Sequence, residues 1–139
     1  LPYDRTILCL VRLQLRHNLA YSHMLEYKQD GDELAGTQGL PEDRFVLANN
    51  WTRGPFDVTW NLNYIGKNGT GTRTTKEYIT HDLQLNWTPS YIKGAKLTVG
   101  VLNLTDERPQ LIRYDGRNFN FYLYDSYGRQ PYVRYTQTF

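Results

Sequence analysis

The sequence has little of what marks most other protein classes. It contains one cysteine, Cys9, so an internal disulfide and a cysteine metal cluster are both excluded. We expect Cys9 to be a small buried apolar residue. No run approaches the roughly 18 apolar residues that a transmembrane helix requires, and the mean hydropathy is -0.65. The formal net charge is only +2 and the basic residues are dispersed, which leaves no basic patch for nucleic acid.

Motifs for catalysis, metal binding and phosphate binding are also missing. The glycines of residues 66–71 precede no predicted helix, so they do not form a phosphate-binding loop. His17 and His23 lie six positions apart on one predicted strand, roughly 20 Å, which is too far to share a metal ion. His81 belongs to a different strand and could meet only one of them. We therefore expect no enzyme activity, no metal site and no cofactor.

What the sequence does contain is alternation of apolar and polar residues, the pattern of a β-strand with two different environments. Residues 13–28 alternate without a break, which predicts one strand about 50 Å long. That is well beyond the usual strand of about 5–6 residues. Shorter alternating segments follow at residues 44–52, 56–64, 77–88, 96–104 and 131–139. The pattern predicts an all-β chain of about six antiparallel strands, the last reaching Phe139.

The connections between these strands alternate in length. Residues 53–55 and 89–94 form short turns, whereas residues 29–43, 66–76 and 108–130 form long loops. Successive connections lie at opposite ends of a sheet, so this order gathers the long loops at one end. Outer-membrane barrels have this asymmetry, and their strands average out near polar. The aromatic residues expected at the short-turn end, which would form an interfacial girdle, are Trp51, Phe56, Trp87 and Tyr91.

The last hairpin, residues 95–139, contains motifs that resemble a known family. Leu102-Asn103-Leu104-Thr105-Asp106-Glu107-Arg108-Pro109 ends one strand, and Tyr124-Asp125-Ser126-Tyr127-Gly128-Arg129 precedes the final one. This order resembles the C-terminal end of TonB-dependent outer-membrane receptors, which have an NLFD-x-x-P segment, a YD-x-x-GR segment and a terminal Phe. Thr105 stands where the family usually has Phe, and Gln137 where an aromatic residue is common. The resemblance implies that Val133, Tyr135 and Phe139 form the signal read by the barrel-assembly machinery.

The resemblance also implies a function. Residues 1–139 would be the C-terminal part of an up-and-down transmembrane β-barrel in the bacterial outer membrane, a fragment of a larger barrel. Such receptors import a scarce ligand, such as a siderophore, cobalamin or an oligosaccharide. The implied partners are the rest of the barrel and its plug domain, outer-membrane lipid and lipopolysaccharide, and the barrel-assembly machinery. TonB would be contacted only through N-terminal parts missing from this chain.

The longest loop, residues 110–130, is the best candidate for a ligand-binding surface. Rigid aromatic side chains beside charged groups make good contact surfaces for polar ligands at low entropic cost. We expect such a surface to be extracellular. The candidate residues are Tyr114, Asp115, Arg117, Tyr122, Tyr124 and Asp125.

Two alternatives stay open from the sequence. A small complete outer-membrane barrel would need about eight strands to close. A soluble lipocalin-like ligand-binding barrel would turn its apolar face inward, but a face as long as residues 13–27 is more than a small core can cover. The membrane interpretation requires apolar side chains to face lipid and polar side chains to face an enclosed space.

Overall fold

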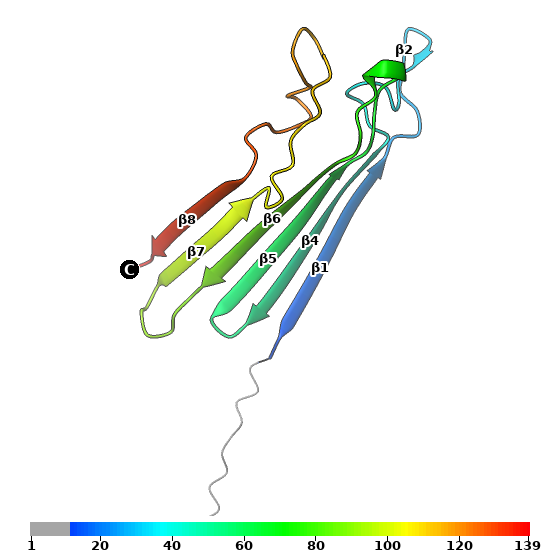
Figure 1. The fold of residues 1–139 in the computed structure, drawn as a ribbon. Helices are drawn as coiled ribbons and strands as arrows, with labels where there is room; N and C mark the ends of the chain where they lie inside the picture. Colours follow the sequence, from blue (N-terminus) through cyan, green and yellow to red (C-terminus); the bar gives the residue numbers. More distant parts are fainter. Residues whose placement is uncertain (1–11) are drawn as a thin grey trace, which may run out of the picture.

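A computed structural model describes residues 12–139, so the expectation for Cys9 lies outside the described residues. The fold is one six-stranded antiparallel sheet (Figure 1). Its strands, in spatial order, are β1 (Gln14–His23), β4 (Asp43–Arg53), β5 (Phe56–Ile65), β6 (Tyr78–Trp87), β7 (Ala95–Leu102) and β8 (Gln130–Gln137). A small separate hairpin pairs β2 (Lys28–Gln29) with β3 (Asp32–Glu33), and η1 (Gly71–Arg73) is a single 3₁₀ turn. The prediction of an all-β antiparallel fold with about six main strands is confirmed.

Each main strand pairs with its neighbours in the chain, which makes the sheet an up-and-down meander. At the short end, Gly54 has φ 57°, and this left-handed conformation, easy for glycine, lets the chain reverse between β4 and β5. The long connections leave the sheet at the other end, where Figure 1 shows them above the strands. The predicted asymmetry between short turns and long loops is therefore present.

The first and last strands of the sheet end before the residues at which the sequence predicted them to end. The alternation of residues 13–28 predicted one strand to Lys28, but β1 ends at His23 because its partner β4 begins at Asp43. One further backbone hydrogen bond joins Met24 to the carbonyl of Glu42. The last strand was predicted to reach Phe139, but β8 ends at Gln137, whose partner Ala95 is the first residue of β7. The alternation of apolar and polar residues therefore continues past the end of a strand when the neighbouring strand no longer offers a partner.

The register gives the sheet two chemically different faces, because directly paired residues point the same way. One row across the sheet is wholly apolar: Leu15, Trp51, Val58, Leu85, Val99 and Val133. The adjacent row on the opposite face is polar or small: Arg16, Asn50, Thr59, Gln84, Gly100 and Tyr132. We call these the apolar face and the polar face.

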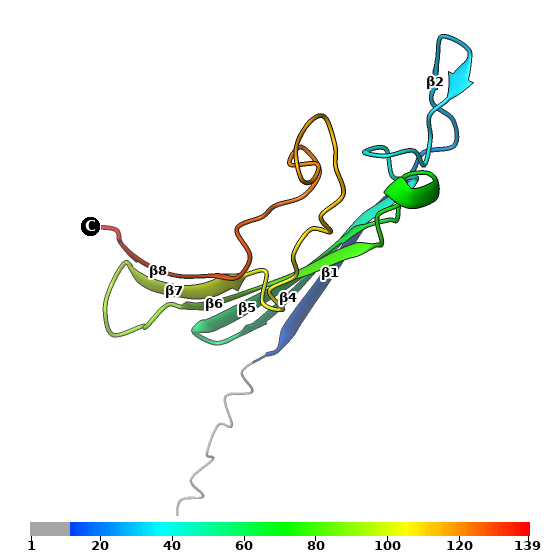
Figure 2. The same ribbon diagram turned by 45° about the horizontal axis from the view of Figure 1, so that its top comes forward.

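The described residues form a single layer in which neither face is covered by a second sheet or a helix (Figure 2). The buried hydrophobic cluster consists of Ile65, Tyr78 and Tyr124, and it lies at the loop end. Large side chains of the apolar face stay exposed, as Leu19 does at 62% and Val133 at 71%. Among residues 12–139, no helix is long or apolar enough to cross a membrane.

Candidate ligand-binding loops and membrane face

Side chains of the polar face form a hydrogen-bonded network, although the buried Oδ1 of Asn61 has no partner among the described residues. Asp57 accepts from the amide of Asn50 at 2.7 Å, from the hydroxyl of Thr52 at 2.9 Å and from the amide of Asn86 at 2.9 Å. Asn86 in turn accepts from the hydroxyl of Thr98 at 2.8 Å. The network spans β4 to β7, so the carboxylate of Asp57 is held by neutral donors. This face suits a hydrated or protein-filled interior.

The residues predicted to form a girdle lie on or just beyond the apolar face near the short turns. Phe56 pairs directly with Trp87, and the ring of Tyr91 lies 6.2 Å from that of Trp87. Trp51 is two positions before the end of β4, and its ring stacks on Trp60 at 6.4 Å. The structure brings three of the four close to the lower rim and places Trp51 slightly further into the sheet.

A second aromatic belt, which sequence reasoning missed, lies at the loop end of the same face. Phe45 and Tyr64 are directly paired and stack at 4.7 Å, and Tyr21 is the partner of Phe45 on β1. From Phe56 to Tyr64 is about 27 Å along the strand. A wall tilt of about 40° reduces this to about 21 Å, close to the apolar band of about 25 Å in outer-membrane barrels. The sequence contained a signal for this second belt, because aromatic residues that alternate onto the same face occur at both ends of a strand.

Polar residues on the apolar face are paired with each other. The imidazole Nδ1 of His17 lies 2.7 Å from the amide oxygen of Asn49, which is only 5% exposed. The indole N–H of Trp60 donates to Nδ1 of His81 at 3.3 Å. Within residues 12–139 no group of three or more His, Cys, Asp or Glu side chains is placed to hold a metal ion.

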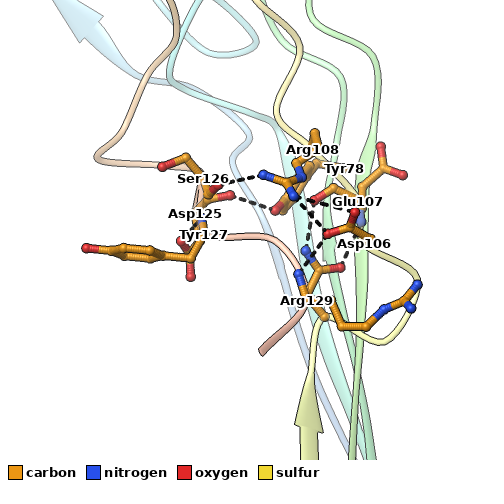
Figure 3. Close-up of polar contacts among 9 residues, drawn as sticks. Tyr78, Asp106, Glu107, Arg108, Asp125, Ser126, Tyr127 and Arg129 are labelled. Atoms are coloured by element: carbon orange, nitrogen blue, oxygen red, sulfur yellow. Dashed lines mark hydrogen bonds and ion pairs between the residues drawn. The ribbon is translucent and has the colours of Figure 1, made fainter. Parts of the chain in front are cut away.

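At the loop end, the two sequence motifs of the last hairpin meet (Figure 3). Asp106 accepts from the backbone N–H of Arg129 at 2.8 Å and forms an ion pair with Arg108 at 3.2 Å. Arg108 also donates to the carbonyl of Ser126 at 3.3 Å. The Arg129 amide and the nearby guanidinium groups hold the pKa of the Asp106 carboxyl below its ordinary value. These contacts close the loop between β7 and β8 at its base.

Gly128 is required at this closure for two reasons. Its φ is +71°, which disfavours any side chain. A Cβ there would also lie 2.5 Å from the carboxylate of Asp106 and 2.6 Å from the guanidinium of Arg108. Asn103, at φ 50°, directly follows β7, and its side chain forms two hydrogen bonds with the backbone of Glu107 at 2.8 and 2.9 Å. The motif residues thus shape the loop and need no ligand to explain them.

The structure separates the six predicted ligand-binding residues into two groups. Tyr114 and Arg117 pair as an isolated bridge around a turn at Asp115, and the guanidinium of Arg117 lies 4.1 Å from the ring centre of Phe121. Tyr122 is 73% exposed and packs against Phe121 at 4.1 Å. Arg117, Phe121 and Tyr122 thus form an accessible surface that combines one cation with two aromatic rings, beside the exposed carboxylate of Asp115.

Tyr124 and Asp125 instead connect the loops. Tyr124 is only 6% exposed; its hydroxyl accepts from the amide of Asn68 at 2.8 Å and lies 3.1 Å from the hydroxyl of Thr75. The hydroxyl of Tyr78 donates to the carbonyl of Asp125 at 3.0 Å. Asn68, Thr75 and Tyr78 were not singled out from the sequence, because no local pattern signals contacts across some 50 positions.

The family model described as "TonB dependent receptor-like, beta-barrel" matches residues 4–104. The chain belongs to the TonB-dependent receptor family. No curated protein and no solved structure matches it. The matched segment ends at Leu104, within the first motif of the last hairpin, and the second motif, residues 124–129, lies outside it.

Membership of the TonB-dependent receptor family identifies what the sheet is part of. The six antiparallel strands are transmembrane strands of a receptor barrel wall. The family consists of receptors and transporters of the bacterial outer membrane, and it is not a family of enzymes. The residues predicted as the assembly signal lie on or beyond β8, where Val133 is 71%, Tyr135 62% and Phe139 fully exposed.

Proposed function

We propose that this chain is the C-terminal part of a TonB-dependent receptor in the bacterial outer membrane and contributes to uptake of a scarce ligand. In this proposal residues 1–139 supply barrel wall and three extracellular loops. Further strands pair with the free edges of β1 and β8, and a plug domain fills the interior. Contact with TonB would occur through that plug-bearing part of the receptor. The ligand belongs to the class of siderophores, cobalamin or oligosaccharides.

The observation that carries this proposal is the division of the sheet into two faces. Rows of large apolar side chains lie exposed on one face, while the side chains of the polar face are joined by hydrogen bonds around Asp57. In water such an exposed apolar face would cause association, whereas in a bilayer it is the lipid contact of a barrel wall. A lipocalin-like barrel requires the apolar side chains to converge on an interior, and those of the described strands do not.

A labelling experiment on intact cells tests the membrane orientation. Cys9 is first replaced by Ser in the complete receptor. Single cysteines are then introduced at Thr72 and Asp115, in long loops, and at Lys93, in a short turn. We expect a membrane-impermeant maleimide to label Thr72→Cys and Asp115→Cys on intact cells and Lys93→Cys only after the outer membrane is permeabilised. The reverse pattern, or recovery of the receptor in the soluble fraction, would contradict the proposal.

An uptake experiment tests the ligand surface. Deleting the gene should abolish use of one scarce nutrient, and the wild-type gene should restore it. We propose that Tyr122 and Arg117 bind this ligand, so the double variant R117A/Y122A should weaken uptake while leaving the amount of folded receptor unchanged. The matched control is Leu111→Ala, because Leu111 is 76% exposed on the same loop but belongs to no predicted contact. Equal uptake by the wild type, R117A/Y122A and Leu111→Ala would show that Arg117 and Tyr122 do not bind the ligand.

A further inference from the structure

The side chain of Asn68 joins the three long loops to each other. Asn68 lies in the loop between β5 and β6 and is only 2% exposed. Its side-chain oxygen accepts from the backbone N–H of Gly39, in the loop that precedes β4, at 2.8 Å. Its amide nitrogen donates to the hydroxyl of Tyr124, in the loop between β7 and β8, at 2.8 Å, and to the carbonyl of Gly66 at 3.2 Å. One buried side chain therefore bonds to all three loops.

These contacts require a side chain that donates and accepts at the same time. An amide has both capacities, whereas a carboxylate only accepts and an aliphatic side chain does neither. Two backbone hydrogen bonds with Thr75, at 2.7 and 3.2 Å, hold the backbone of Asn68 within its own loop. The side chain is then free to bond partners 29 and 56 positions away, in Gly39 and Tyr124. Asn68 is thus more than a turn residue of its own loop.

The same contacts hold the turn that carries Tyr122, one of the two residues proposed to bind the ligand. The carbonyl of Asn120 accepts from the N–H of Tyr124 at 3.1 Å, and its side-chain oxygen accepts from the N–H of Tyr122 at 3.0 Å. Asn120 is only 6% exposed and lies close to Gly39, where a Cβ would be 2.9 Å from the Asn120 amide nitrogen. Both ends of the turn are therefore fixed, and Tyr122 is exposed between them.

We propose that Asn68 is a positioning residue for the ligand surface, because it holds Gly39 and Tyr124 together and so fixes the turn that presents Tyr122. A surface that is ordered before the ligand arrives loses less conformational freedom on binding, which favours affinity. Loss of a contact in one loop then loosens the other loop, because both depend on the same amide. The inference rests on the proposed function for the role of Tyr122, whereas the connection between the loops can be measured without a ligand.

The first test is hydrogen exchange of the Gly39 amide in the complete receptor in phosphatidylcholine vesicles. Tyr124→Phe removes a hydroxyl from a different loop. The protection of Gly39, the ratio of its intrinsic to its observed exchange rate, should nevertheless fall about fivefold, the effect of one neutral hydrogen bond. In the Asn68→Ala background Tyr124→Phe should cause no further fall. The matched control is Tyr127→Phe, at a position 79% exposed in the same loop, which should leave Gly39 unchanged.

Three results would overturn the inference. Gly39 could keep its full protection in Tyr124→Phe, or lose as much in Tyr127→Phe. The third result is an effect of Tyr124→Phe that persists in the Asn68→Ala background, because the connection would then pass through Asn120. Heat-modifiable electrophoretic mobility shows that each receptor is folded, and Tyr124→Phe compared with Tyr127→Phe decides the outcome if Asn68→Ala does not fold.

The second test separates positioning from a general loss of structure. Its probe is the nutrient whose use is lost when the gene is deleted. Asn68→Ala should raise the concentration for half-maximal uptake about fivefold and leave the maximal rate unchanged, while Leu111→Ala should change neither. A lower maximal rate with an unchanged half-maximal concentration would contradict the positioning role. Normal uptake by R117A/Y122A would instead contradict the proposed ligand surface and leave the exchange result intact.

Discussion

Gly100 and Tyr132 form a contact on the polar face that can be tested quantitatively. The two residues are directly paired between β7 and β8, and the Tyr132 ring lies across Gly100 to donate to the side chain of Gln84 on β6 at 2.8 Å. A Cβ at position 100 would be 2.5 Å from the hydroxyl oxygen of Tyr132 and 2.7 Å from its Cε1. Because Gly100 has no positive φ, the effect of a substitution there is due to space alone.

The expected cost of Gly100→Ala follows from these distances. Overpacking a filled site costs about 1–3 kcal/mol, and loss of the hydrogen bond from Tyr132 to Gln84 adds about 1 kcal/mol. The free energy of unfolding should therefore fall by about 2–4 kcal/mol. Tyr132→Phe removes only the hydrogen bond and should cost about 1 kcal/mol. In the Gly100→Ala background Tyr132→Phe should cost almost nothing, because the bond is already broken.

The assay is urea unfolding of the complete receptor in phosphatidylcholine vesicles, followed by tryptophan fluorescence. G100A/Y132A is the matched control, since it adds the methyl group and removes the ring with which it collides. This double variant should be more stable than the sum of the two single effects predicts. Two results would refute the packing argument. One is that the effects of Gly100→Ala and Tyr132→Ala on the free energy of unfolding simply add. The other is that Gly100→Ala is within about 0.5 kcal/mol of wild type, the effect of a neutral surface change.

Three further predictions concern the loops. Because the folded-state pKa of Asp106 is lowered, its stabilising effect is present above its unfolded pKa of about 3.9 and is lost as pH falls through the folded value. The protection of the Arg129 amide, measured as the ratio of its intrinsic to its observed hydrogen-exchange rate, should fall over the same pH range, and Asp106→Ala should remove this pH dependence. Gly128→Ala should open the same loop, seen as faster proteolysis between β7 and β8 in the complete receptor. Tyr124→Phe should lower stability by about 1–3 kcal/mol by leaving buried polar partners unsatisfied, whereas Tyr127→Phe, at a position 79% exposed, should have little effect.

Much of the wall could be predicted from the sequence because a strand's period is a local property. Residues 56–64 alternate cleanly, and β5 occupies Phe56–Ile65 with the predicted faces. The end of a strand is different, because it depends on whether a partner is present. The alternation of residues 24–27 is as regular as that of residues 14–23, but β4 begins at Asp43 and gives it no continuing partner. Local periodicity contains no information about that limit.

The loops were less predictable for a related reason. The aromatic character of residues 114–127 suggested a ligand surface, but exposure depends on what other loops cover. Tyr122 is exposed, whereas Tyr124, two positions later, is buried against Asn68 and Thr75 from the β5–β6 loop. Composition cannot separate these two tyrosines. Their different environments are set by contacts between loops that are far apart in the chain.

Periodicity also cannot say which face of a barrel wall meets lipid. The cost of placing the polar groups of each face in hydrocarbon answers this question. A polar face turned to hydrocarbon would remove the charged side chains of Asp57, Asp82 and Arg134 from water, at a cost of several kcal/mol for each ion even where it is hydrogen-bonded. The apolar face has the opposite property, because His17 and Asn49 satisfy each other and Trp60 donates to His81. Its few polar atoms are therefore largely paired where water is absent. The same cost explains why Glu42, Lys67 and Glu77, which have no partners among the described residues, lie beyond the loop-end aromatic belt, at the height where polar headgroups begin.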